Sequence, residues 1–150
     1  MCLEINKKLH RCLFAKSGYK VIRLKEDMPV YKILLYSAHW NRWTTPFQGL
    51  KILFAGGKSV LPPFTDKQFK VVECGYKGEF GYHSFVTKER VGKVLDDMIK
   101  HESNYLYRGK AVLCTAVIPK GSMVFYGTHE DICSSNLIIN NPSSNYAFEL

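Results

Sequence analysis

This sequence predicts an α+β fold: a strongly twisted, mostly antiparallel sheet with one main helix, about residues 87–103, packed on a face. Two segments carry most of the prediction. A helical pattern with an N-terminal cap begins at Thr87, and an apolar run over 111–118 stops at Pro119. The length of 150 residues and the 46% share of hydrophobic residues are those of one globular domain, so we expect a single domain over 1–150.

Strand patterns lie on both sides of the helix. Residues 19–24 alternate apolar and basic side chains, as a half-exposed strand does, and 30–36 read as a more buried strand. Residues 50–54 and 59–61 flank a turn with two glycines at 55–58, which predicts a hairpin because glycine accepts the positive φ of such turns. Further short strands are expected at 69–74, 123–127 and 136–139.

The helix is defined by its cap and its apolar face. Thr87 can accept a backbone N–H of the first turn, and Glu89 lies near the positive end of the helix dipole. Apolar residues at spacings of three and four form one face: Val91, Val94, Leu95, Met98 and Ile99. The run over 111–118 lacks strict alternation, which predicts a strand at the centre of the sheet with both faces covered.

The two ends and one connection read as irregular. Residues 1–19 predict a loose basic arm, and 140–150 predict a turn-rich tail. Before the last strand, we expect a polar loop through His129, Glu130 and Asp131. Three polar residues in a row are more typical of a solvated loop than of a metal site, so no metal is expected.

Charge is distributed unevenly along the chain, whose net charge is +8. Residues 1–70 hold thirteen Lys and Arg against four Asp and Glu, whereas 71–150 hold eight against nine. Such asymmetry is typical of a protein that meets an acidic surface on a nucleic acid or another protein. A lysine-rich solvated face that only aids solubility is the alternative.

Several classes of protein are not indicated. No window reaches the roughly 18 apolar residues that span a bilayer, and the first twenty residues lack the apolar core of a signal peptide. The five cysteines form no C-x-x-C pair, so neither a zinc knuckle nor a thioredoxin-type site is suggested, and we expect reduced thiols. We expect no cofactor.

The segment 37–49 holds both tryptophans and is the first candidate for a binding site. Aromatic rings beside an arginine can stack on a base, and the same residue types dominate protein interfaces. The alternative is that one or both tryptophans cap the core under a loop. The candidate partner-binding residues are His39, Trp40, Arg42, Trp43, Lys51 and Lys58.

His83 is the second candidate, because a histidine at a strand end beside a helix start can act as a general base or contact an anion. The alternative is a ring that only hydrogen-bonds a backbone carbonyl. Ser84 would point to the opposite face of the strand, so the two are no nucleophile–base pair. Residues 56–59 lack the spacing of a phosphate-binding loop.

Four segments together resemble a group of small uncharacterised proteins encoded by bacteriophages and other viruses. The resemblance covers about residues 30–140. It rests on the strand at 30–32, the turn at 45–49, the motif Gly81-x-His83-Ser84-Phe85-x-Thr87 and the turn Ile118-Pro119-Lys120-Gly121-Ser122. These motifs are turns and caps, so the resemblance implies a viral origin and no particular activity.

The segment 116–122, followed by a Tyr-Gly pair and by 137–139, is similar to the last strands of toxin-type ADP-ribosyltransferases. In that family a pair of glutamates precedes the final apolar strand, and the matching positions here hold Ser134 and Asn136. The arginine of the family's first core strand corresponds to Lys32. Because an amide cannot replace the catalytic carboxylate without a large loss, the resemblance implies a degenerate binder.

We therefore expect a non-enzymatic viral accessory protein, located in the host cytoplasm or the virion. It would bind a host defence factor, a nucleic acid or a virion component through its basic N-terminal half and the tryptophan-containing loop. Two alternatives stay open. One is a nucleotide-binding or ADP-ribosyltransferase-like enzyme with His83 and Lys32 as catalytic residues, and the other is a minor capsid subunit.

Overall fold

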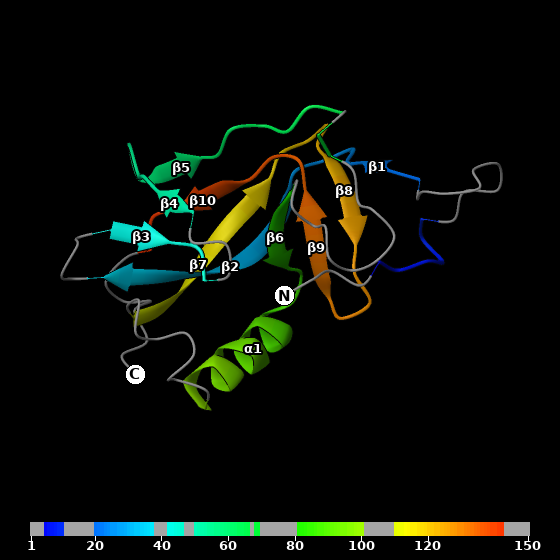
Figure 1. The fold of residues 1–150 in the computed structure, drawn as a ribbon. Helices are drawn as coiled ribbons and strands as arrows, with labels where there is room; N and C mark the ends of the chain where they lie inside the picture. The colour runs from blue at the N-terminus through cyan, green and yellow to red at the C-terminus, as the bar shows by residue number, and fades with distance from the viewer. Residues whose placement is uncertain are drawn as a thin grey trace.

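The computed structural model describes residues 5–10, 20–37, 42–46, 50–66, 68–69, 81–100 and 110–142 (Figure 1). One helix, α1 (Lys88–Lys100), lies on one side of a sheet. The strands are β1 (Ile22–Arg23), β2 (Met28–Ser37), β3 (Arg42–Thr44), β4 (Lys51–Ile52), β5 (Lys58–Val60), β6 (Tyr82–Phe85), β7 (Lys110–Ile118), β8 (Met123–Tyr126), β9 (Asp131–Ser134) and β10 (Ile138–Asn140).

The strands form one sheet in the order β1-β8-β9-β6-β2-β7-β10-β5, and off this path β3 pairs with β2 and β4 pairs with β3. Every strand pair that the structure describes is antiparallel. The predicted antiparallel sheet with one helix is thus confirmed for the described residues, although the sheet dominates. Of the predicted helix 87–103, residues 101–103 lie outside the described part.

The centre of the sheet is the pair β2–β7. The two strands run in register from Met28 opposite Ile118 to Tyr36 opposite Lys110. On the other side of β7 lies β10, which confirms that the apolar run 111–118 is a central strand. Neighbouring side chains of β2 enter different clusters, so both faces of this pair are covered.

One face of the sheet surrounds a curved core, a cluster that draws residues from β2, β4, β6, β7, β8, β9 and β10. Strands this far apart in the sheet order can share one cluster only if the sheet bends around it. The buried members of the curved core are Val30, Leu34, Ile52, Leu61, Tyr82, Val112, Cys114, Ala116, Ile118, Val124, Ile132, Leu137 and Ile139.

The other face packs against α1. The helix contributes the predicted apolar face, of which Val91, Val94, Leu95 and Met98 are buried. Ile33 and Leu35 of β2 meet them from the sheet. The side chain of Ile99 lies outside the described part.

Thr87 caps the helix as predicted. Its Oγ1 accepts the backbone N–H of Arg90 at 3.2 Å and donates to Oε2 of Glu130 at 2.7 Å. The carbonyl of Glu130, a residue with a φ of +57°, accepts the N–H of Val86 at 2.8 Å. The turn between β8 and β9 therefore fixes the start of the helix.

The predicted hairpin at 50–61 is only partly right. Ala55 and Lys58 exchange two backbone hydrogen bonds around Gly56 and Gly57, whose φ angles are +61° and +79°. Beyond this turn the flanking strands separate, because β4 pairs with β3 and β5 pairs with β10.

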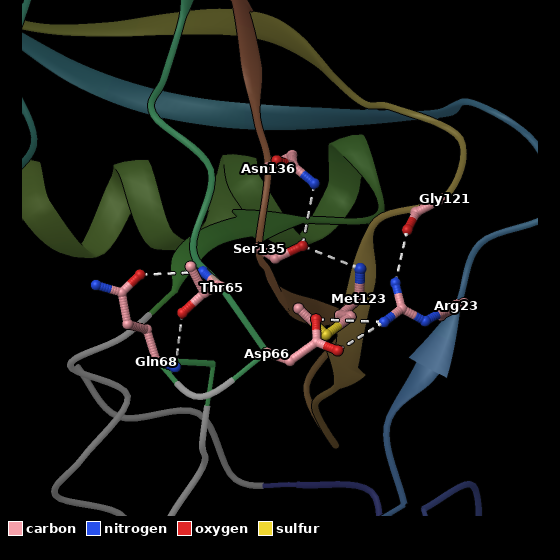
Figure 2. Close-up of polar contacts among 8 residues, drawn as sticks. All are labelled: Arg23, Thr65, Asp66, Gln68, Gly121, Met123, Ser135 and Asn136. Carbon is pink, nitrogen blue, oxygen red and sulfur yellow. Dashed lines mark hydrogen bonds and ion pairs between the residues drawn. The ribbon is translucent and has the colours of Figure 1, made fainter.

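The polar loop expected through His129, Glu130 and Asp131 is wrong in part, because Asp131 begins the strand β9, Asp131–Ser134, whose four residues are all buried. Burial of its polar residues is possible because they are hydrogen-bonded. Ser134 Oγ donates to the carbonyl of Asn136 at 2.8 Å. Next to the strand, Ser135 Oγ accepts the Met123 N–H at 3.0 Å and an amide proton of Asn136 at 3.1 Å (Figure 2).

The remaining predicted strands are shorter or fall outside the described part. The strand at 19–24 is reduced to β1, and most of 69–74 is not described. Of the expected arm, residues 5–10 are described, and they lie against β8 through a bridge between Ile5 and Gly127. Of the expected tail 140–150, only 140–142 are described. No helix in the described ranges is long and apolar enough to cross a membrane.

Candidate partner-binding surface

The predicted partner-binding residues divide between the described and undescribed parts of the chain. His39 and Trp40 lie outside the described residues. Arg42 and Trp43 lie on β3, Lys51 lies on β4, and Lys58 begins β5. The register places Lys51 opposite Thr44, so the basic residues of β3 and β4 lie on neighbouring strands.

Trp43 points toward the protein and not away from it. Its ring lies 4.7 Å from that of Tyr36 and meets Phe54 edge-on at 5.8 Å. All three rings pack against the curved core. Trp43 therefore caps the core, which is one of the two interpretations that the sequence allows, and is only partly exposed.

The outward side of β4 and β5 combines basic and aliphatic side chains. Lys51 and Lys58 are exposed. Leu53 and Val60 are exposed as well, with 70% and 72% of their surface accessible to solvent. The residues between them, Ile52 and Ser59, are buried, which is the alternation of a half-exposed strand. We call Lys51, Leu53, Lys58 and Val60 the β4–β5 face. The tight turn at Gly56 and Gly57 joins its two halves.

Acidic residues are absent from the sequence around this face. No Asp or Glu occurs between Asp27 and Asp66, and the basic residues in that stretch include Arg42, which is exposed. On β7, the exposed Lys110 lies opposite Tyr36. Asp66 lies elsewhere, in an ion pair with Arg23 at 3.2 Å (Figure 2). The charges that this stretch presents to an acidic partner are thus all positive.

Leu53 and Val60 are the residues of this surface that the sequence reasoning missed. The sequence carries little signal for them, because residues 52–55 are all apolar and Val60 is followed by another apolar residue, so neither side of the glycine turn alternates in polarity. The hairpin interpretation treated both strands as partners of each other. It therefore gave no account of which side chains would face outward.

Lys32 and His83 meet through the backbone but not through their side chains. Lys32 is only 8% exposed, and its Nζ donates to the carbonyl of His83. Along β2, Lys32 shares the face of Val30 and Leu34, toward the curved core. On β6, Tyr82 belongs to the curved core and Phe85 to the cluster packed on α1, so alternation places His83 on the helix side with Phe85. The His83 ring and the Lys32 ammonium therefore belong to opposite faces of the sheet.

The surroundings of Lys32 are those of a buried structural group. Burial lowers the pKa of its ammonium to about 8, against smaller opposite effects of Cys133 and Cys114. Burial also raises the pKa of each of these thiols to about 12, so both stay protonated and unreactive at neutral pH. Ser84 Oγ is buried without a hydrogen-bond partner among the described residues, so Lys32 does not activate it.

The carboxylates at 130–131 are also engaged in structure. Glu130 accepts the Thr87 hydroxyl, and Asp131 is buried with Oδ1 accepting the His129 N–H at 3.3 Å. Burial raises the pKa of Asp131, although backbone hydrogen bonds from Asp131 and His129 and the charges of His129 and Arg90 act in the opposite direction. Across the residues that the structure describes, no group of three or more His, Cys, Asp or Glu side chains could hold a metal ion.

In comparisons with known proteins, no family model, no curated protein and no solved structure matches this chain. The likeness to virus-encoded proteins and to ADP-ribosyltransferases therefore stays a prediction from the sequence motifs. Any function has to be argued from the described surface itself.

Proposed function

We propose that this chain is a non-enzymatic binding protein that uses the β4–β5 face and Arg42 to bind an acidic macromolecular partner. The observation that carries the proposal is the composition of that face. Lys51 and Lys58 project outward in a carboxylate-free stretch that also carries two aliphatic side chains at least 70% exposed. Exposed aliphatic side chains in a stretch whose charges all have one sign are typical of an interaction surface.

The same composition favours a protein partner over a nucleic acid. Leu53 and Val60 gain nothing from a phosphate backbone, whereas an apolar contact surrounded by charge pairs is the usual anatomy of a protein interface. Nucleic-acid surfaces commonly add exposed aromatic rings, but Trp43 packs inward against Tyr36 and Phe54. A host defence factor and a virion component, the two protein classes expected from the sequence, both fit this description.

Charge reversal on the face is the direct test. The variant Lys51→Glu/Lys58→Glu changes only exposed residues, and Lys88→Glu/Lys93→Glu makes the same charge change on exposed positions of α1. Proteins from infected host cells are captured on each form, after nuclease treatment, and those lost only with the first variant are identified. The identified partner is then purified and its affinity for all forms is measured.

We expect the face variant to bind the purified partner about tenfold more weakly or worse, because reversed charges opposite carboxylates repel. The α1 variant should bind as the wild type does. An equal loss of affinity in both variants would show that only the net charge of the protein matters, which contradicts a specific face. Unchanged affinity in the face variant would refute the proposal.

Leu53→Ser/Val60→Ser separates the two classes of partner. A protein partner should lose affinity in this variant, whereas a single-stranded oligonucleotide should not. If instead the oligonucleotide binds wild type with a steep salt dependence, and charge reversal alone abolishes binding, the partner is a nucleic acid.

A further inference from the structure

The residues packed against β8 hold a histidine in an unusual setting. His10 is completely buried, and its ring lies 5.3 Å from that of Phe125 and 5.9 Å from that of Tyr126. Both ring nitrogens bond to the backbone. Nδ1 lies 2.8 Å from the Lys20 carbonyl oxygen, and Nε2 lies 2.8 Å from the Tyr126 nitrogen.

These two bonds define the protonation state of the ring. A carbonyl oxygen can only accept, so Nδ1 of His10 carries a proton and donates it to Lys20. The Tyr126 amide can only donate, so Nε2 must present its lone pair. The geometry therefore requires the neutral Nδ1–H tautomer, and a second proton would set two donors against each other.

His10 belongs to a short segment that covers one edge of the sheet. We call residues 5–10 the strap. Ile5 bridges to Gly127, and the Asn6 N–H donates to the Tyr126 carbonyl at 2.8 Å. Ile5 is also buried in a cluster with other apolar side chains, namely Phe69, Met123, Phe125 and Cys133. The strap thus shields the outer part of this cluster from water.

Among the residues that the structure describes, the groups around the ring offer no compensation for a second proton. On the strap itself, Lys7 and Lys8 are exposed and carry the same sign of charge as an imidazolium. From β8 come the rings of Phe125 and Tyr126, and Lys20 contributes its carbonyl. Burial lowers the pKa of His10, and the Lys20 carbonyl raises it to a smaller extent.

We propose that the strap is an acid-releasable cover, in which protonation of His10 breaks its bond to Tyr126 and detaches residues 5–10 from β8. Release would uncover the edge of β8 and the apolar side chains of Met123 and Phe125. This inference does not depend on the β4–β5 face or on its partner.

The direction of the pH effect follows from the pKa of His10 in the two states. In the docked strap the pKa lies below the ordinary value of 6.5, which the ring recovers when it is released. Above about pH 6.5 the ring is neutral in both states and docking is at full strength. As pH falls below that value, only the released state takes up the proton, so docking weakens by at most about tenfold per pH unit until the docked ring also titrates.

Nuclear magnetic resonance tests both halves of the proposal on the whole chain. At about pH 7.5, long-range nitrogen correlations should show the proton of His10 on Nδ1, which is the rarer tautomer. Between about pH 7.5 and pH 5, protection of the Tyr126 amide against hydrogen exchange, relative to its intrinsic rate, should fall, by no more than about thirtyfold. Protection of the Leu113 amide, in the centre of β7, should stay constant.

Variants decide whether His10 is the cause. His10→Gln cannot titrate, so its Tyr126 protection should not depend on pH, and His129→Gln, at an exposed histidine, should respond as wild type does. A proton on Nε2 at neutral pH would overturn the proposal even if His10→Gln did not fold. An unchanged protection factor in wild type, or an equal fall in His10→Gln, would overturn it as well.

Discussion

The centre of the sheet and its basic end, the strands β4 and β5, differ in how deeply their side chains are buried. In the β2–β7 pair, Val30, Leu34 and Ile118 are buried to 1% exposure or less, and even the lysine of β2 points inward. At the basic end, β4 and β5 have only two and three residues, and alternate side chains project into solvent. The β2–β7 pair therefore contributes most of the stability, whereas substitutions on the β4–β5 face should change binding more than stability.

Leucine truncation should show this difference at its largest. Leu34 is completely buried in the curved core, so Leu34→Ala should lower the free energy of unfolding by about 2–5 kcal/mol through lost burial and a cavity. Leu53 is 70% exposed, and Leu53→Ala should change it by no more than about 0.5 kcal/mol. Urea unfolding of both variants measures the two values, and equal values would contradict the division into centre and end.

Lys32 is the place where the centre works against stability. Its ammonium has a single described acceptor, the His83 carbonyl, and burial takes its pKa from an ordinary 10.5 to about 8. Below pH 8 the folded and unfolded chains both hold the proton, so the full cost of burying the charge, about 3 kcal/mol, weighs on the fold. We expect Lys32→Met to be more stable than wild type at neutral pH, although the lost bond to His83 reduces the gain.

The pH dependence identifies this cause. Between about pH 8 and 10.5 the folded chain has lost the Lys32 proton and the unfolded chain still holds it, so the stability of wild type gains relative to Lys32→Met as pH rises. Urea unfolding of both forms from pH 7 to 10 should show the advantage of the variant shrinking by about 2–3 kcal/mol. A constant difference would mean that Lys32 is not a buried cation.

Two glycines sharpen the comparison further, since each is required for a different reason. A Cβ on Gly81, next to β6, would lie 2.2 Å from Cys133 Sγ, so Gly81→Ala should cost about 1–3 kcal/mol. At the basic end a Cβ on Gly57 meets nothing within 4 Å, but its φ of +79° makes Gly57→Ala cost about 1 kcal/mol.

A double-mutant cycle in urea distinguishes crowding from backbone strain. Cys133→Ala removes the atom that a Cβ on Gly81 would strike, so it should recover part of the loss in Gly81→Ala. It should leave the loss in Gly57→Ala unchanged. Additive effects for the first pair would show that the contact with Cys133 does not explain the requirement for glycine.

The parts of the fold that local patterns describe could be predicted, and those that depend on distant partners could not. Thr87 and the apolar face beginning at Val91 specify the helix within one stretch of chain, and the run 111–118 alone indicates a central strand. The strand β9 was missed because Ser134 is polar, and its burial depends on the carbonyl of Asn136 accepting its hydroxyl proton. The pairing of β5 with β10 joins segments too far apart for a turn pattern to predict.

The candidate surface shows the same limit. The basic character of residues 28–65 is a property of the sequence, and so are the positions of Lys51 and Lys58. The sequence does not show which aromatic side chains face outward. Trp43 faces inward because its ring packs against those of Tyr36 and Phe54, which come from other segments of the chain. The sequence gives one local indication of the inward position of Lys32, because residues two apart on a strand share a face and Lys32 lies between Val30 and Leu34 on that face.

The smallest expected effect is the stability of the proposed binding variant. Lys51 and Lys58 are exposed on the β4–β5 face, and neither makes a described ion pair, so Lys51→Glu/Lys58→Glu should change the free energy of unfolding by no more than about 0.5 kcal/mol. The change should be favourable in sign, because it lowers a net charge of +8 and its self-repulsion. Urea unfolding at low salt measures it. A loss of stability above about 1 kcal/mol would show that these lysines support the fold. Binding would then be compared in the milder variant Lys51→Gln/Lys58→Gln.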